Sequence, residues 1–262
     1  MFSKVTIIQR PRVSYGLAAA VMLMAGCTQA EDTNTPQAVK ALEAQGLTIV
    51  QEFEVNGDLR AFAGVANGQP IAVYLTGEGE TIVGTRLDVN GEPLDAVTLQ
   101  ELAAGPMDDK TWAELESATW VVDGNMDAPR VVYTFSDANC PYCNRFWEAA
   151  RPWVDSGQVQ LRHLLVGVIK EDSPAKAAAI LGAPDPSAAL AKNERQFAQG
   201  GIAPAESVPA DVQRVITDNQ ALMRSNGFRG TPGIVVRESD GSVRKFYGMP
   251  QGEQLAEALG PR

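Results

Sequence analysis

The fold of this chain is decided by residues 130–143, RVVYTFSDANCPYC. Residues 130–135 are rich in β-branched and aromatic side chains, which is typical of a buried strand. A short polar loop follows, and Cys140 stands where a helix is expected to begin. Apolar side chains then recur at helical spacing, namely Phe146, Trp147, Ala150 and Val154. The stretch therefore predicts a strand, a loop and a helix that opens on a Cys-x-x-Cys pair.

The remaining C-terminal residues continue in an α/β order. The predicted elements are a strand (159–168), alanine-rich helical stretches (170–228), a hairpin around Asp240-Gly241 (233–237 and 243–247) and a closing helix (251–259). Strands that alternate with helices in this way indicate a layered α/β domain. We therefore expect one α/β domain over residues 130–262, with a helical insert at about 170–228.

The first half of the chain has a different pattern. After a short helical segment, strand-like runs alternate with turns such as Asn56-Gly57 and Asn90-Gly91. Short runs joined by tight turns predict an antiparallel sheet of hairpins. We expect a small α+β domain over residues 36–99. A linker helix, broken at Gly105-Pro106, and a joint follow over residues 100–129.

The N-terminus has the layout of a secretory signal over residues 1–30. Its apolar run is shorter than the ~20 residues that span a bilayer. Two cleavage sites stay open. Met24-Ala25-Gly26-Cys27 is similar to the bacterial lipobox, in which Cys27 is lipidated, and the alternative cut follows Ala30. Either way we expect an exported protein of the periplasm, anchored by a lipid in the first case and free in the second.

Charge and cysteine usage restrict the partners. Without the three basic leader residues, 19 basic and 32 acidic residues remain, a net charge of −13. Such a surface repels nucleic acid, whereas unfolded protein clients stay compatible. Apart from Cys27, the chain has only Cys140 and Cys143, so it is not a disulfide-stapled scaffold. The pair is therefore expected to serve chemistry or metal binding.

A cysteine at the start of a helix faces free backbone N–H groups and the positive end of the helix dipole. Both stabilise a thiolate, so the pKa of Cys140 is expected below the free value of ~8.5. Because the thiolate is the nucleophile in disulfide exchange, Cys140 is predicted to attack and Cys143 to resolve the mixed disulfide. Pro141 suits the first turn because it has no N–H to lose. Tyr142 does not ionise near neutral pH, which favours a milder oxidant than a His there.

The alternative for this motif is half of a zinc site or a metal-carrying site. Zinc needs about four ligands. The single histidine, His163, lies in an apolar strand, and there is no second cysteine pair. We therefore expect no metal and no cofactor, and interpret His163 as a strand residue. By their spacing, Phe146, Trp147 and Trp153 are core residues before they are a client-binding patch.

Residues 135–143, with the strand before and the helix after them, resemble the thioredoxin fold. Thr231-Pro232, ahead of the strand at 233–236, matches the cis-proline that packs beside the sulfurs in that fold. A closer resemblance is to the DsbC/DsbG family of periplasmic thiol:disulfide interchange proteins. It is strong over residues 131–181 and weak in the N-terminal region, where only domain order and size agree. The segments that carry it are FW (146–147), ARPWVDSG (150–157), VQLR (159–162), LLVGVIK (164–170), SPA (173–175) and AAAIL (177–181).

The resemblance implies a homodimer joined through the first, cystatin-like domain. It implies that a membrane thiol reductase of the DsbD type keeps the cysteine pair reduced. The activity implied is isomerisation of disulfides or reduction of oxidised client cysteines, sulfenylated ones included, with the backbone of Thr231 beside the sulfurs. Two alternatives stay open, a dithiol oxidase that introduces disulfides and a chaperone-like holder of clients. Thr134 departs from the pattern, because thioredoxins carry a buried carboxylate six residues before the first cysteine.

Overall fold

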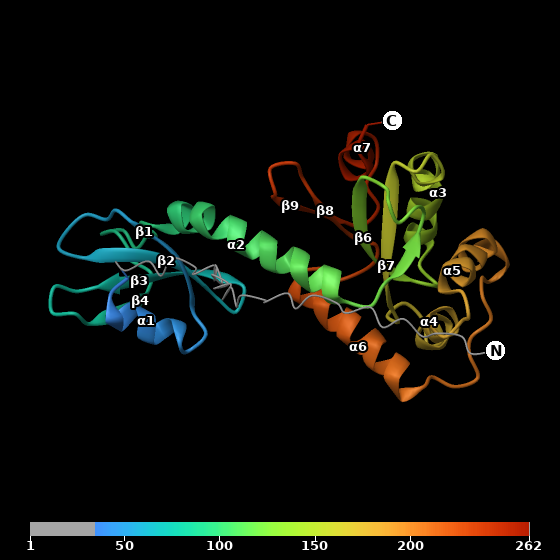
Figure 1. Cartoon of the computed structure of the whole chain (residues 1–262), viewed down its shortest axis with the longest axis horizontal. Helices are drawn as coiled ribbons and strands as arrows, with labels where there is room; N and C mark the ends of the chain where they lie inside the picture. The colour runs from blue at the N-terminus through green and yellow to red at the C-terminus, as the bar shows by residue number, and fades with distance from the viewer. Residues whose placement is uncertain (1–34, 262) are drawn as a thin grey trace, which may run out of the picture. The chain divides into compact units, whose positions relative to one another are not determined.

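The computed structural model describes residues 35–261 (Figure 1). The predicted leader and Cys27 lie outside the described residues. The described strands form one four-stranded and one five-stranded sheet. Within residues 35–261, no helix is both long and apolar enough to cross a membrane.

The first sheet is a run of antiparallel hairpins in the order β1-β2-β3-β4, as the turn pattern predicts. Its connection at Asn67 and Gly68 has φ of 51° and 73°, which a two-residue turn between twisted strands requires. Val39 of α1 packs on one face, and Leu99 of α2 packs on the other. The elements are α1 (Gln37–Glu43), β1 (Thr48–Phe53), β2 (Arg60–Ala66), β3 (Gln69–Leu75) and β4 (Thr81–Gly84).

The linker helix differs from its prediction. α2 (Ala96–Ser117) continues through Gly105 and Pro106, so the expected break is wrong. Proline removes one backbone hydrogen bond from a helix, but packing can hold the turns on either side of it. Here Leu99 and Ala103 are buried before Pro106 and Leu115 after it. The expected boundary between residues 99 and 100 therefore lies inside this helix.

The second sheet has the order β5-β7-β6-β8-β9, in which only β6 and β7 run parallel. β5 was not predicted, since residues 100–129 were expected to form only the linker helix and a joint. Its valines instead pair with β7, where β-branched side chains fit a sheet. The strands are β5 (Val121–Asp123), β6 (Arg130–Asp137), β7 (Val159–Val166), β8 (Gly233–Arg237) and β9 (Val243–Tyr247).

Helices cover both faces of this sheet. One core joins the sheet to α3 and α7, with Phe146 and Trp153 at 1% and 3% exposure, so the core assignment of these aromatic residues is confirmed. Another core joins the opposite face to the end of α2 and to α6 through Leu115 and Met223. The helices are α3 (Pro141–Asp155), α4 (Ser173–Leu181), α5 (Pro186–Arg195), a 3-10 turn (Phe197–Gln199), α6 (Ala210–Ser225) and α7 (Glu253–Leu259).

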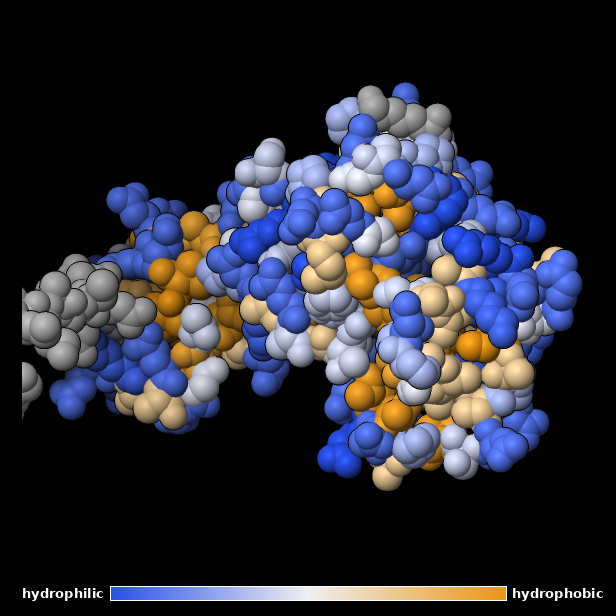
Figure 2. Space-filling model, turned by 45° about the vertical axis from the view of Figure 1, so that its right-hand side comes forward, coloured by the Kyte–Doolittle hydropathy of each residue, from blue (hydrophilic) through white to orange (hydrophobic). Residues whose placement is uncertain are grey.

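The surface in Figure 2 is polar over most of its area, with apolar residues at several separate places. Large apolar side chains are exposed around β4 and the start of α2. This group, here called the β4–α2 apolar group, consists of Ile82, Val83, Leu87, Val89, Leu94 and Val97. Exposed apolar side chains that gather in one region mark an interaction surface more often than scattered ones do.

Candidate active site at the Cys140–Cys143 pair

The cysteine pair lies where β6 passes into α3. Cys140 is the N-cap of α3, and Pro141 is its first residue. The backbone N of Cys140 donates to the carbonyl of Asp137 at 2.9 Å, which closes the turn after the strand. The backbone N of Cys143 then donates to Cys140 Sγ at 3.2 Å. The sulfur of Cys140 therefore occupies the place of a capping side chain, where free N–H groups stabilise a negative charge.

The two thiols have opposite electrostatic environments. A hydrogen bond from the Cys143 thiol, with further ones from Thr231 and the first helical N–H groups, outweighs burial and lowers the pKa of Cys140 to about 7. Burial and the adjacent Cys140 raise the pKa of Cys143 well above its usual value. Both residues are free cysteines, with exposures of 2% and 4%. Near neutral pH, the negative charge of the pair therefore resides on Cys140.

Thr231 and Pro232 meet the pair from the entrance of β8. Their peptide bond is cis, and the Cys140 thiol donates to the Thr231 carbonyl at 3.4 Å. The Thr231 hydroxyl is buried and has no partner among the described residues while the thiol is protonated, so it is free to donate to the thiolate. Tyr142, between the two cysteines, is 53% exposed, and the Arg145 guanidinium lies over its ring.

The loop before Cys140 is held by the segment that follows β7. Asp137, only 1% exposed, accepts four hydrogen bonds. Its Oδ1 binds the backbone N of Asn139 and the hydroxyl of Ser173, each at 2.8 Å. Its Oδ2 binds the backbone N of Val168 at 2.6 Å and of Ile169 at 3.0 Å. The carboxylate thereby ties the end of β6 to the start of α4.

Two further side chains from the helices complete this hold. Lys176 on α4 donates to Asn139 Oδ1 at 2.8 Å and to the Gly200 carbonyl at 2.7 Å. Asn193 on α5 donates to the Ala138 carbonyl at 3.2 Å. Sequence reasoning missed these residues, because their partners lie 37 and 55 positions away along the chain. A run of polar residues between a buried strand and a helix was the only signal.

A buried polar row lies on the sheet face that carries α3. Thr134 Oγ1 is 3.3 Å from Ser136 Oγ, which is 3.2 Å from His163 Nδ1. His163 lies in β7, where the sequence pattern placed it, and its Nε2 is 3.7 Å from Asp123 Oδ2. Burial acts to raise the pKa of Asp123, but His163 and Arg151 outweigh it and lower that pKa to about 2. No group of three His, Cys, Asp or Glu side chains in residues 35–261 is arranged to hold a metal.

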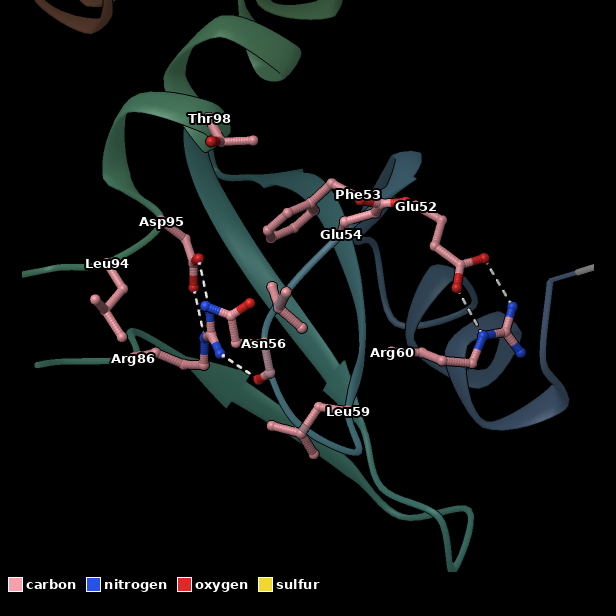
Figure 3. Close-up of a pocket in the computed structure, with 11 residues that line it drawn as sticks. Glu52, Phe53, Glu54, Asn56, Leu59, Arg60, Arg86, Leu94, Asp95 and Thr98 are labelled. Carbon is pink, nitrogen blue, oxygen red and sulfur yellow. Dashed lines mark hydrogen bonds and ion pairs between the residues drawn. The ribbon is translucent and has the colours of Figure 1, made fainter.

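A hollow of about 820 Å³ lies against the first sheet, away from the cysteine pair (Figure 3). Asp95 at its edge accepts two hydrogen bonds from Arg86, at 2.8 and 2.9 Å, and one from the Tyr74 hydroxyl at 2.8 Å. Hydrogen bonding to Arg86 lowers the pKa of Asp95 against the effect of burial. Because these charges neutralise each other, they fix the start of α2.

Comparison with known proteins agrees with the geometry at the cysteine pair. The model of the thioredoxin-like domain family matches residues 122–260, which is more than half of the chain and defines its class. The thiol:disulfide interchange protein DsbG of Pseudomonas aeruginosa is 40% identical over 256 residues, covering 97% of this chain and 99% of that protein. DsbG of Escherichia coli K12 is 39% identical over 230 residues, covering 86% and 91%.

The chain therefore belongs to the DsbG family of thiol:disulfide interchange proteins and is a protein thiol–disulfide oxidoreductase. Among solved structures, the catalytic domain of Proteus mirabilis ScsC aligns with 58% of this chain and 93% of its own, at 22% identity and a TM-score of 0.48. That likeness is too distant to bear on function.

Proposed function

We propose that this chain is a periplasmic, homodimeric reductase and isomerase of oxidised protein cysteines, including sulfenylated ones. Cys140 acts as the attacking nucleophile and Cys143 as the resolving thiol. The observation that carries the proposal is the asymmetry of the pair, with the pKa of Cys140 lowered to about 7 and that of Cys143 raised well above its usual value. A thiolate available at neutral pH beside a thiol that keeps its proton suits two successive attacks.

The reaction begins when the Cys140 thiolate attacks an oxidised client sulfur. With a client disulfide, one client sulfur leaves as a thiolate and takes up a proton. With a sulfenic acid, the oxygen leaves as water once protonated. Cys143 then loses its proton and attacks Cys140 Sγ, which breaks the mixed disulfide and returns the client as a thiol. A membrane reductase of the DsbD type supplies the two electrons that restore the dithiol. In isomerisation, a client thiol makes the second attack instead, and the pair stays reduced.

The remaining site residues have positioning roles in this proposal. Pro141 starts the helix that presents Cys140, and the half-exposed ring of Tyr142, next to Cys143 in the chain, offers an apolar contact to a client. Thr231 borders Cys140 through its carbonyl, so its backbone is suited to hydrogen-bond an extended client strand. Pro232 holds this segment at the entrance of β8, where its carbonyl accepts from the backbone N of Gly248 at 2.9 Å.

Dimerisation and export rest on separate observations. The β4–α2 apolar group leaves six large apolar side chains exposed, and a second copy of the chain is the partner that the family resemblance favours. The predicted signal directs the chain to the periplasm. Whether a lipid on Cys27 also anchors it there is decided by the mass of the mature N-terminus, because a chain that starts at Glu31 has lost Cys27.

The central test is the substitution Cys140→Ser. We expect it to lower the rate of reduction of a sulfenylated or mispaired client by at least about 100-fold, since an alcohol is a far weaker nucleophile than a thiolate. Cys143→Ser is expected to accumulate the client as a mixed disulfide on Cys140, visible in a non-reducing gel. Full activity of the Cys140→Ser protein would refute the mechanism.

Two measurements, the redox state of Cys140 and the aggregation of a client, separate the proposed function from its alternatives. The fraction of Cys140 that is a free thiol in the periplasm distinguishes the reductase or isomerase, which is mostly reduced, from a dithiol oxidase, which is mostly oxidised. Suppression of client aggregation that survives in the double cysteine mutant, without any redox turnover, would support the chaperone-like function in place of the proposed one.

A further inference from the structure

A buried carboxyl group, that of Glu194 on helix α5, lies next to the first turn of α3. Thr134, the β6 residue six positions before Cys140, carries no carboxyl group. Glu194 does, it is only 5% exposed, and its carboxylate is directed at the first turn of α3. Its Oε2 accepts from Asn144 Nδ2 at 2.9 Å, and its Oε1 accepts from Asn193 Nδ2 at 3.1 Å. Asn144 directly follows Cys143 in the chain.

Asn144 links this carboxyl group to the cysteine turn. Its side-chain amide also donates to the Glu194 backbone carbonyl at 2.8 Å, so one amide holds both the backbone and the side chain of Glu194. Its backbone N donates to the carbonyl of Cys140 at 3.2 Å. One peptide unit, one amide side chain and one hydrogen bond therefore separate the carboxylate from Cys143.

The charge of Glu194 is poorly compensated. Burial raises its pKa, and the hydrogen bonds from Asn144 and Asn193 oppose this only in part. The groups facing it from the sheet are His163 on β7, which lowers the pKa, and Asp123 on β5, which raises it. Arg151 on α3 is already bound to Asp123, and no lysine or arginine of the described residues forms an ion pair with Glu194.

We propose that Glu194 is the buried acid of this active site, a positioning residue whose negative charge competes with that of the thiolate. The inference deepens the proposed function and rests on its resolving step. In that step the Cys143 thiol loses a proton, its sulfur bonds to Cys140 Sγ, and the bond from Cys140 to the client breaks. The electron pair leaves with the client sulfur, which takes up a proton.

The competition is expected across the short path from Glu194 through Asn144 to Cys143. While Glu194 holds its proton, negative charge develops on the sulfurs with no negative charge on the carboxyl group that Asn144 binds. Once Glu194 ionises, the same charge is opposed across a water-poor interior, where screening is weak. Because coupling between two titrating groups is reciprocal, a thiolate also makes Glu194 harder to ionise. Glu194 thus limits how much thiolate the pair carries as the pH rises.

The test is the thiolate titration of reduced protein, followed by its absorbance near 240 nm, for three variants. We expect Glu194→Gln to increase the acid dissociation constant of Cys140 by about 3- to 10-fold, because a like charge is removed. Glu194→Asp keeps the charge and is expected to titrate like the unchanged protein. Glu148→Gln, on the exposed side of α3, is the matched control and is expected to change nothing.

Equal titrations of Glu194→Gln and the unchanged protein would overturn the inference, as would equal shifts in Glu194→Gln and Glu194→Asp, because the second result indicates packing instead of charge. If Glu194→Gln does not fold, the ¹³C signal of the Glu194 carboxyl in the unchanged protein replaces it. We expect a second inflection at the thiol pKa in the reduced form and none in the disulfide form, and a single inflection in both overturns the inference. None of these readouts needs a client, so a failure of the proposed function is seen separately.

Discussion

The two sheets of this chain each bury carboxylates, and they treat the charge in different ways. In the first sheet, Asp95 accepts from Nε and Nη2 of Arg86 and from the Tyr74 hydroxyl, so its charge is balanced in place. Beside the second sheet, Glu194 is bound by amides that carry no charge. A balanced charge stabilises one arrangement, whereas an unbalanced buried acid keeps a perturbed pKa, which is typical of functional sites.

The largest effect on stability is expected for Asp95→Asn. It leaves the part-buried Arg86 without a counter-charge, so we expect a loss of about 1–3 kcal/mol in the free energy of unfolding, measured with denaturant at pH 7. The pKa of Asp95 is lowered in the folded protein, so its contribution is present above the unfolded pKa and disappears as the pH falls through the folded pKa. The two proteins should therefore converge in acid.

Glu52→Gln is the matched control for that change in the same sheet. The side chains of Arg60 and Glu52 are 42% and 40% exposed, and exposed pairs of this kind contribute little to stability. A loss for Asp95→Asn no larger than that for Glu52→Gln would show that the buried pair has no special weight. The thiol pKa of Cys140 should stay unchanged in both variants.

A smaller effect is expected for Lys176→Met, which removes a charged donor that holds the loop before Cys140. The substitution leaves the Asn139 side chain and the Gly200 carbonyl without their donor, which costs about 1–2 kcal/mol of stability. We also expect a change of a few-fold in the rate at which Cys140 reacts with a small alkylating reagent. Lys192→Met, on the exposed side of α5, is the control, and equal behaviour of the two variants contradicts the role of Lys176.

The smallest effect has the opposite sign. Burial raises the pKa of Glu194, so ionisation of this group destabilises the folded state as the pH rises above the unfolded pKa. Glu194→Gln is therefore expected to be as stable as the unchanged protein at pH 8, or more stable by less than about 1 kcal/mol. At pH 4 that advantage should vanish. A loss of stability at pH 8 comparable to that of Asp95→Asn would mean that the charge of Glu194 is compensated in the folded protein, as the charge of Asp95 is.

The part of the site that local residues determine was predictable from the sequence. A β-branched strand, a polar loop and Cys140 ahead of Pro141 specify the strand, the turn and the N-cap through short-range preferences. The hairpins of the first sheet were predictable for the same reason, because turns such as Asn67-Gly68 adopt positive φ readily. These features depend on neighbours a few residues apart.

The rest depends on contacts between distant residues. Pro106 was expected to break α2, but side chains buried on both sides of it hold one helix. Glu194 contacts a residue 50 positions earlier, and nothing in an alanine-rich helical segment marks it as part of an active site. Sequence patterns report the elements, whereas the buried polar contacts between elements appear only in the folded chain.

The hold on residues 137–139 has a consequence for protein engineering. The hydrogen-bonding groups described above that hold this loop lie within residues 168–193, on the segment after β7 and on helices α4 and α5. A transplant of the Cys-Pro-Tyr-Cys sequence into a smaller scaffold of the same class would carry the sulfurs but not their support. A designer who wants this reactivity in another host has to move the two helices together with the motif.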